Sequence, residues 1–335
     1  MKVLIAGESS IHLQNYCCAI KTYVDEIILI TETPIMITEA KKSYVISFRD
    51  MNPIKWFFNI QKLKRIISDE NPDLVHIHQI NRLAYFIAKS IYKTPLVSTA
   101  WGSDVLLVPK RNFIFSNFSR YVIRKSRYVT ADAQVMIDAM KKMDNSSSKY
   151  IHLQYGIDTV APSTKEKVIY SNRLHNKLYN IETIIKYFAE FSKNNPEWEL
   201  HIAGKGEETE KLKSLAAGLK VKFLGWLNKE QNNEQYAKAS IYVSIPSSDG
   251  TSVSLLEAIS ANCIPVVSDL PVSHEWILDG VNGVIRKGNK NPFKEALTIN
   301  KEKCFAINQK KINASAKKEE TTKKFFELYK KALSK

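Results

Sequence analysis

The chain has 335 residues, which is enough for two domains of ordinary size, each with a substantial core. Its 44% hydrophobic and 25% charged residues are typical of a globular protein, and its four cysteines show no spacing that indicates a disulfide framework or a zinc site. No apolar run approaches the roughly 20 residues of a membrane span, and the N-terminus begins a strand, not a signal peptide. The formal net charge of +15 favours an anionic partner, such as nucleic acid, a nucleotide-linked substrate or the negative surface of a membrane.

The first half of the chain alternates predicted strands with predicted helices. Apolar and β-branched runs predict strands at 1–6, 26–30, 43–48, 74–78, 96–100 and 128–131. Helical periodicity falls between them, after residue 10 and at 54–68, 81–91 and 113–125. This order predicts a parallel sheet. Gly7 follows the first strand without opening a Gly-x-Gly-x-x-Gly, which argues against a dinucleotide-binding dehydrogenase.

Two short motifs in this half each have two interpretations. His76 and His78 share one face of a predicted strand, as two metal ligands could, but no third ligand at metal spacing accompanies them. We therefore expect a structural role for both. Asp104 ends the segment Thr-Ala-Trp-Gly-Ser-Asp after a buried strand, where a helix N-cap and a ligand-binding carboxylate are about equally good interpretations.

A stretch of basic and aromatic residues spans 110–127, with the sequence KRNFIFSNFSRYVIRKSR. Interleaved cations and rings of this kind fit interfacial membrane binding. They also fit RNA binding, or a solvated helix face above a core.

The second half repeats the strand and helix alternation after a polar linker at 159–167. Strands are predicted at 167–170, 199–203, 220–225, 241–245 and 263–267, and helices at 181–191, 253–261 and 321–333. In the loop at 247–252, Gly250 is free to take a positive φ, and the N–H groups of Gly250, Thr251 and Ser252 at a helix N-terminus form a ready anion site. Asp249 and Glu257 flank this site. On the local pattern alone, Asp249 is a helix N-cap and Glu257 closes a capping box with Ser254.

This region resembles the signature of the family 4 retaining glycosyltransferases of GT-B architecture. The matching residues are Pro246, Glu257-Ala258, Pro265-Val-Val-Ser268, Glu275 and Asp279-Gly-Val-Asn-Gly283. Three positions depart from the family pattern: Asp249 stands where Glu is usual, Trp101 where His is usual, and Asn262 where Gly is usual. Asn262 can still take the left-handed position after the helix.

The resemblance implies an α/β fold of the GT-B type, with two Rossmann-like, doubly wound parallel-sheet domains that face each other across a cleft. Residues 1–160 would form the N-terminal, acceptor-side domain, and residues 164–316 the nucleotide-sugar donor domain. The last helix, at 317–335, would pack back on the first domain.

The resemblance also implies roles for single residues. Glu257 would bind the donor ribose and Asp249 the donor sugar, while Arg173 and Lys177 would hold the diphosphate together with the amides of residues 250–252. Further donor contacts would come from Gly7, Gly204 and Val253. The acceptor side of the cleft would include His12, Trp101 and Asp104. The leaving phosphate would take the acceptor proton, so that no side-chain base is required.

The implied function is a retaining hexosyltransferase that moves a sugar from a nucleotide-diphosphate sugar, UDP-linked by preference, to a saccharide or lipid-linked acceptor of polysaccharide or lipopolysaccharide synthesis. We expect no cofactor and no metal, because the chain contains no Asp-x-Asp. The expected location is the cytoplasm, with peripheral contact to an anionic membrane through 110–127 and no nucleic acid partner. The alternatives are a GT-B nucleotide-sugar epimerase and a catalytically inactive basic homologue that binds membrane or RNA. The donor sugar and the acceptor are not readable from the sequence.

Overall fold

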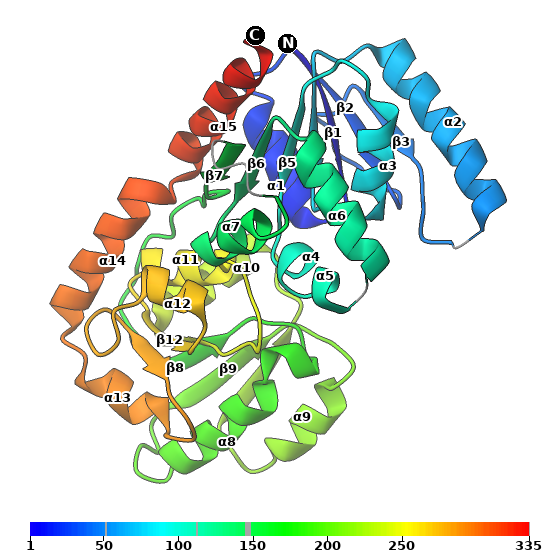
Figure 1. Cartoon of the computed structure of the whole chain (residues 1–335). Coiled ribbons are helices and arrows are strands. Elements are labelled where there is room, and N and C mark those ends of the chain that lie inside the picture. The colour runs from blue at the N-terminus through cyan, green and yellow to red at the C-terminus, as the bar shows by residue number, and fades with distance from the viewer. Residues whose placement is uncertain (51, 112, 145–148, 335) are drawn as a thin grey trace. The chain divides into compact units, whose positions relative to one another are not determined.

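The computed structural model describes residues 1–50, 52–111, 113–144 and 149–334 (Figure 1), without the side chains of Lys110 and Arg111. The chain divides into two compact units. Unit 1 comprises Met1–Tyr155 and Lys318–Lys335, and unit 2 comprises Gly156–Lys317. The division falls after Tyr155 instead of at residue 160, because Ile157 already pairs with Lys317 of unit 2.

Unit 1 is built on a seven-stranded sheet in the order β3-β2-β1-β4-β5-β6-β7. Neighbouring strands run parallel throughout. The strands are β1 (Lys2–Gly7), β2 (Glu26–Thr31), β3 (Lys42–Val45), β4 (Leu74–His78), β5 (Leu96–Thr99), β6 (Tyr128–Ala131) and β7 (Tyr150–His152). The central strands are buried on both faces, which explains their continuous apolar sequences.

Three helices of unit 1 begin after a polar residue whose side chain caps the helix N-terminus. Ser10, Asn52 and Asn81 each accept a hydrogen bond from the first turn of the helix that follows. The helices are α1 (Ile11–Ile20), α2 (Pro53–Glu70), α3 (Arg82–Ser90), α4 (Ser103–Leu106), α5 (Val108–Arg111), α6 (Phe113–Lys125), α7 (Gln134–Lys141) and α15 (Lys318–Leu333).

Helix α15 is fixed to unit 1 by a buried polar chain. The Tyr329 hydroxyl lies 2.7 Å from the Tyr16 hydroxyl of α1 and 2.6 Å from Nδ1 of His76. The other ring nitrogen of His76 lies 2.7 Å from the Thr99 hydroxyl. The two nitrogens of His76 are thus occupied by hydroxyl groups, which is the structural role that we expected for this residue.

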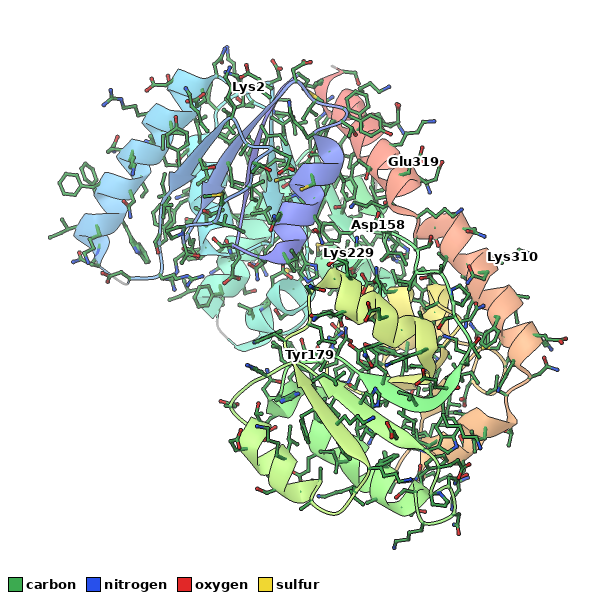
Figure 2. The ribbon with its side chains drawn as sticks, turned by 180° about the vertical axis from the view of Figure 1, so that it is seen from behind. Lys2, Asp158, Tyr179, Lys229, Lys310 and Glu319 are labelled. Atoms are coloured by element: carbon green, nitrogen blue, oxygen red, sulfur yellow. The ribbon has the colours of Figure 1, made fainter. Side chains whose placement is uncertain are left out.

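Unit 2 contains a six-stranded parallel sheet in the order β10-β9-β8-β11-β12-β13. The strands are β8 (Glu166–Ser171), β9 (Glu199–Ala203), β10 (Val221–Gly225), β11 (Ala239–Ser244), β12 (Ile264–Ser268) and β13 (Val284–Arg286). The helices are α8 (Ile181–Phe191), α9 (Thr209–Leu215), α10 (Lys229–Lys238), α11 (Val253–Ser260), α12 (Pro271–Trp276), α13 (Pro292–Thr298) and α14 (Lys301–Ser315). Asp158 and Lys229, labelled in Figure 2, form an ion pair within this unit.

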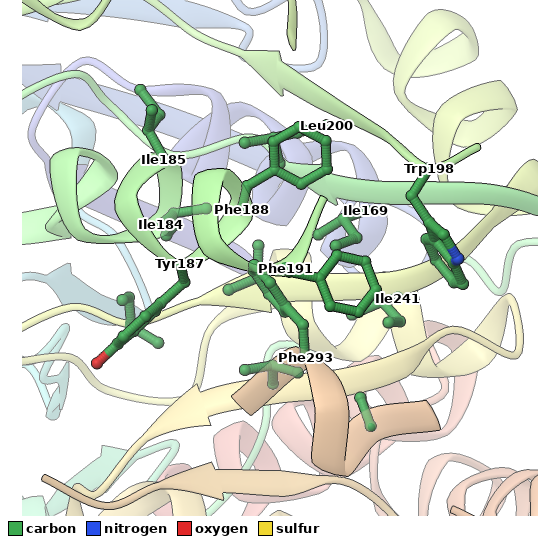
Figure 3. Packing of buried hydrophobic residues seen from close by; sticks show 14 of the residues in the cluster. Ile169, Ile184, Ile185, Tyr187, Phe188, Phe191, Trp198, Leu200, Ile241 and Phe293 are labelled. Carbon is green, nitrogen blue, oxygen red and sulfur yellow. The ribbon is translucent and has the colours of Figure 1, made fainter. Parts of the chain in front are cut away.

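Two apolar clusters cover the two faces of the sheet in unit 2. Ile241 belongs to one cluster and the next residue of β11, Tyr242, to the other, as the period of two in a strand requires. Figure 3 shows the first cluster, in which Phe188 and Phe191 of α8 pack with Leu200 of β9. Burial of such a side chain contributes about 1.5–3 kcal/mol. The strand order of each sheet reverses once, at β1 in unit 1 and at β8 in unit 2, as in doubly wound sheets, and the predicted α/β fold class is confirmed.

No helix in the described residues is long and apolar enough to span a bilayer.

Candidate functional site

The polar loops of unit 2 gather where its central strands end. Ser171, Ser244 and Ser268 are the last residues of β8, β11 and β12, and all three are buried. In open α/β sheets, ligands bind at this carboxyl edge. The segments that carry Arg173 and Asp249 both start here.

The loop after β8 is pressed against the loop after β9, and glycines make the contact. Gly204 has a φ of +107°, and a Cβ on it would lie 2.6 Å from the carbonyl oxygen of Arg173. A Cβ on Gly206 would clash with the backbone of His175, whose N–H donates to the Lys205 carbonyl over 3.2 Å. Gly204 thus allows the Arg173 backbone to pack closely against it. This packing role is distinct from the donor contact that we predicted for Gly204.

The guanidinium of Arg173 is the centre of the site. Its Nη2 donates to Oδ2 of Asp249 over 2.7 Å, and its Nη1 donates to the hydroxyl of Ser252. It also lies over the ring of Tyr179, 4.3 Å from the centroid. Burial alone would lower the pKa of Arg173, but the carboxylate of Asp249 outweighs burial and holds that pKa above its ordinary value.

Asp249 has no capping role. The N-cap of α11 is Ser252, whose hydroxyl accepts from the N–H of Leu255 over 3.4 Å. The cap at Asp249 and the box between Ser254 and Glu257, which the local pattern alone favoured and the resemblance argued against, are therefore not formed. The carboxylate of Asp249 is bound instead by the buried guanidinium of Arg173. Gly250, which is free to take a positive φ, does not take one in this loop.

Glu257 lies in the second turn of α11 and is half-buried. Burial raises the pKa of its carboxyl group, while a hydrogen bond with Tyr236 opposes that rise. The Tyr236 hydroxyl also accepts from the side-chain amide of Asn172 over 2.6 Å. A carboxylate held in this way can accept hydrogen bonds from a pair of hydroxyl groups. Val253, the first residue of the same helix, lies between Glu257 and the anion-binding loop in sequence.

Lys177 lies in a 3-10 turn at Lys177–Tyr179 and its side chain is exposed. Within the described parts of the chain it forms no hydrogen bond or ion pair. Sequence reasoning singled out this cation and missed Tyr179, two residues later, which contacts Arg173 directly. The sequence signal for Tyr179 was an aromatic residue in the same loop as the candidate arginine, where its ring can pack against the guanidinium.

The other predicted residues lie in unit 1. A Cβ on Gly7 would lie 2.9 Å from the carbonyl oxygen of His78, so close packing of β1 and β4 explains this glycine. The rings of His12 and Trp101 meet edge to face with centroids 5.8 Å apart. The indole N–H of Trp101 donates to the Tyr155 hydroxyl.

Asp104 has a third role that neither interpretation anticipated. It is a buried residue of α4, whose N-cap is Gly102. Its carboxylate accepts from the backbone N–H of Ile80 over 2.7 Å and from that of Trp101 over 3.0 Å. Asp104 therefore joins the loops after β4 and β5, and burial raises the pKa of its carboxyl group against these hydrogen bonds. In the described residues, no group of three or more His, Cys, Asp or Glu side chains could hold a metal ion.

The two halves of the chain match two family models. The model for glycosyl transferases group 1 matches residues 157–318, and the model for glycosyl transferase 4-like proteins matches residues 2–133. The chain is also similar to the poly(glycerol-phosphate) alpha-glucosyltransferase of Bacillus subtilis, with 30% identity over 235 residues. That match covers 67% of this chain and 33% of the relative, so the chain spans about a third of the length of this curated relative.

Solved structures share the fold at low sequence identity. HepE of Anabaena, solved with UDP and glucose, has a TM-score of 0.81 at 13% identity, with 99% of this chain and 100% of that chain covered. The pneumococcal O-GlcNAc transferase GtfA, solved with UDP and GlcNAc, has a TM-score of 0.69 at 15% identity over 82% of this chain and 60% of that one. At these identities the structures establish the fold alone. With its two matching models and its two doubly wound sheets, the chain belongs to the group 1, family 4 type of glycosyltransferases with the GT-B fold.

Proposed function

We propose that this protein is a retaining glycosyltransferase that uses a nucleoside diphosphate sugar, with UDP as the nucleotide. Its acceptor is a saccharide or a lipid-linked molecule of glycan synthesis. One observation carries this proposal. Arg173 lies at the N-terminus of α11 and donates to the N-cap Ser252, and the same helix carries Glu257. The UDP bound to HepE and GtfA, and the name of the Bacillus subtilis relative, support the same reading.

The diphosphate belongs at the cationic end of this site. Arg173 retains donors beyond the two that it uses for Asp249 and Ser252, and the amides of residues 250–252 lie at the start of α11. Lys177, whose side chain is exposed, adds a second cation. When the leaving diphosphate gains negative charge in the transition state, these fixed donors stabilise it. A metal ion is then unnecessary, and the proposal includes none.

The two acids bind the hydroxyl groups of the donor. Glu257 binds the ribose hydroxyls and Asp249 a hydroxyl of the donor sugar, while Gly7, Gly204 and Val253 provide further donor contacts. In the reaction the bond between the anomeric carbon and the diphosphate oxygen breaks. The acceptor oxygen bonds to the same face of that carbon, and its proton passes to the leaving phosphate oxygen.

The acceptor meets His12 and Trp101 of unit 1, where the indole can stack on a sugar ring. Asp104 positions this loop through backbone hydrogen bonds. The alpha-glucosyl product named for the Bacillus subtilis relative is the anomer that retention gives from an alpha-linked donor. We place the reaction in the cytoplasm, at the inner face of the membrane if the acceptor is lipid-linked.

A thermal-shift comparison of UDP, GDP, TDP, CMP and ADP, each with and without EDTA, tests the donor site. We expect stabilisation by UDP that EDTA leaves unchanged, that Arg173→Ala and Glu257→Ala abolish, and that the surface variant Lys213→Ala retains. Stabilisation that requires Mg²⁺ or Mn²⁺ would contradict the metal-free site. Absence of a shift with every nucleotide would overturn the proposed donor class.

Stereochemistry needs a separate measurement. Slow hydrolysis of an alpha-linked UDP-sugar, followed by proton NMR, should first release the alpha anomer of the sugar. First release of the beta anomer would show inversion and contradict the proposed mechanism.

A further inference from the structure

Helix α8 of unit 2 starts at a residue in an unusual conformation. Asn180, the N-cap of α8, has a φ of 52° and a ψ of 36°, which is the left-handed region. In the described structure its side chain forms no capping bond with the helix, although asparagine is among the best N-cap residues. A residue that takes a sparsely populated conformation without capping its own helix is held by contacts elsewhere, and such residues are common at functional sites.

The side chain of Asn180 contacts the loop that leads to Asp249. Its amide donates to the carbonyl of Ile245 over 2.9 Å and to the hydroxyl of Ser247 over 3.0 Å. Two residues before Asn180, the carbonyl of Leu178 accepts from the N–H of Ser247 over 2.8 Å. The end of the loop after β8 is therefore joined to the loop after β11, just before Asp249.

Tyr179 lies between Leu178 and Asn180 and contacts Arg173 directly (it is labelled in Figure 2). The guanidinium lies over the tyrosine ring, with 4.3 Å between its carbon and the ring centroid. The N–H groups that bind Asp249 and Ser252 lie in the plane of the guanidinium, so the ring adds a contact of a different kind. The guanidinium can leave its position only by losing the ring contact or one of these bonds.

Leu178, Tyr179 and Asn180, which we call the clasp, thus hold both partners of the ion pair between Arg173 and Asp249. Tyr179 restrains the arginine, while its two neighbours fasten the loop that carries the aspartate. A donor that is fixed before the ligand arrives loses less conformational entropy on binding than a free one. Donors fixed in this way also stabilise charge that develops in a transition state.

We propose that Tyr179 and Asn180 are positioning residues for the diphosphate, which act through Arg173 and the loop at 245–249. This inference rests on the proposed donor site and assigns part of its affinity for a diphosphate to two side chains that carry no charge. The contribution concerns the phosphates alone. It should therefore be absent for uridine, which has the base and the ribose of UDP but no phosphate.

Asn180→Gly separates this role from a purely structural one. Glycine takes a positive φ without strain, so the melting temperature should change little, but the bonds to Ile245 and Ser247 are lost. We expect calorimetry to show UDP binding at least about fivefold weaker, with unchanged binding of uridine. The matched control is Asn71→Gly, because Asn71 also has a positive φ, 41°, and ends helix α2 of unit 1. It should bind UDP like the wild type.

Tyr179→Leu and Tyr179→Phe test the ring. Leucine removes the aromatic face, so UDP should bind at least about threefold more weakly, whereas phenylalanine keeps the face and should bind UDP within about twofold of the wild type. Uridine affinity should be unchanged in both variants. Tyr92→Leu, at a tyrosine of unit 1 that is 87% exposed, is the control and should bind UDP normally.

The results distinguish failure of the positioning role from failure of the proposed function. If the wild type does not bind UDP, the proposed function is refuted. If the wild type binds UDP, and Asn180→Gly and Tyr179→Leu bind it equally well, only the positioning role is refuted. A loss of uridine affinity as large as the loss of UDP affinity would place the effect on the fold of unit 2 and would also overturn the positioning role.

Discussion

Arg173 and Asp249 form an ion pair with 2.7 Å between Nη2 and Oδ2, and this pair joins the loop after β8 to the loop before α11. The sequence resemblance assigned the two side chains to different parts of a donor, the diphosphate and the sugar. In the structure each is the partner of the other, and only 10% of the arginine side chain is exposed. The diphosphate of the proposed donor must therefore share the guanidinium of Arg173 with Asp249, or displace the Asp249 carboxylate from it.

Asp249→Asn should consequently separate nucleotide binding from sugar transfer. Loss of the carboxylate removes a negative charge beside the diphosphate, so we expect UDP to bind about fivefold more tightly, or about 1 kcal/mol. Transfer from the UDP-sugar should fall at least about tenfold, because the hydrogen bond to the sugar is weakened. Calorimetry with UDP and a transfer assay check the two effects. Asp269→Asn, which removes an exposed acid of unit 2, is the control, and weaker UDP binding in Asp249→Asn would contradict the competition.

Gly204→Ala should damage the site through the backbone of Arg173. The new Cβ would lie 2.6 Å from the Arg173 carbonyl at a φ of +107°, so we expect a loss of about 1–3 kcal/mol in the free energy of unfolding. UDP affinity should fall as well, because the loop that carries the guanidinium must shift.

Gly218→Ala is the matched control for this prediction. Gly218 also has a positive φ, +79°, but no heavy atom lies within 4 Å of its ideal Cβ. It should show only the conformational cost of about 1 kcal/mol and normal UDP binding, measured by urea unfolding and calorimetry. Equal loss of UDP affinity in both variants would show that Gly204 has no specific effect on Arg173.

Much of the fold was predictable because each strand and helix has a strong local signal. The helix at 113–125 and the strand at 128–131 were predicted at their observed bounds, and Asn262 takes the predicted left-handed conformation with a φ of 61°. β7 was missed, because its three residues are too few to show a strand period. The short helices α4 and α5 were missed for a similar reason.

The site was harder to predict than the fold, because its partners are distant in sequence. Five of the six residues from Ser247 to Ser252 carry a side-chain oxygen that could cap α11. The structure uses Ser252, while Asp249 binds Arg173, a residue 76 positions away in sequence. Asp104 is a comparable case, since its partner at Ile80 comes from another loop. The exposure of Ile54, Phe57 and Phe58 on α2 was not predictable, because a run such as Ile54–Phe58 also fits a buried helix and exposure depends on what packs beside it.

Glu257 should make UDP binding sensitive to pH. Burial raises the pKa of its carboxyl group, so protonation begins at a higher pH than for an exposed glutamate, whose pKa is about 4.3. The ionised form accepts two ribose hydroxyl hydrogen bonds and the protonated form does not, so affinity should fall as pH decreases through the raised pKa. The affinity of Glu257→Gln should be lower and should lack this step. Calorimetry with UDP and with uridine measures this pH dependence, and because uridine has no phosphate, the comparison separates titration of Glu257 from titration of the phosphate. If Glu257→Gln retained the pH step, the step would belong to another group.

His76 and His78 should make the stability of unit 1 fall in acid. Burial lowers the pKa of His78 to about 3, and it lowers the pKa of His76 well below its ordinary value, helped by His78 with its ring centroid 4.1 Å away. In the unfolded chain both have pKa values near 6.5, so below about pH 6.5 the unfolded state binds protons that the folded state excludes. The stabilisation is complete above pH 6.5 and is lost at about 1.4 kcal/mol per pH unit for each histidine as pH falls. Urea unfolding between pH 7.5 and 4.5 should show a slope reduced by about one proton in His78→Gln. An unchanged slope in His78→Gln would mean that His78 is already protonated in the folded state.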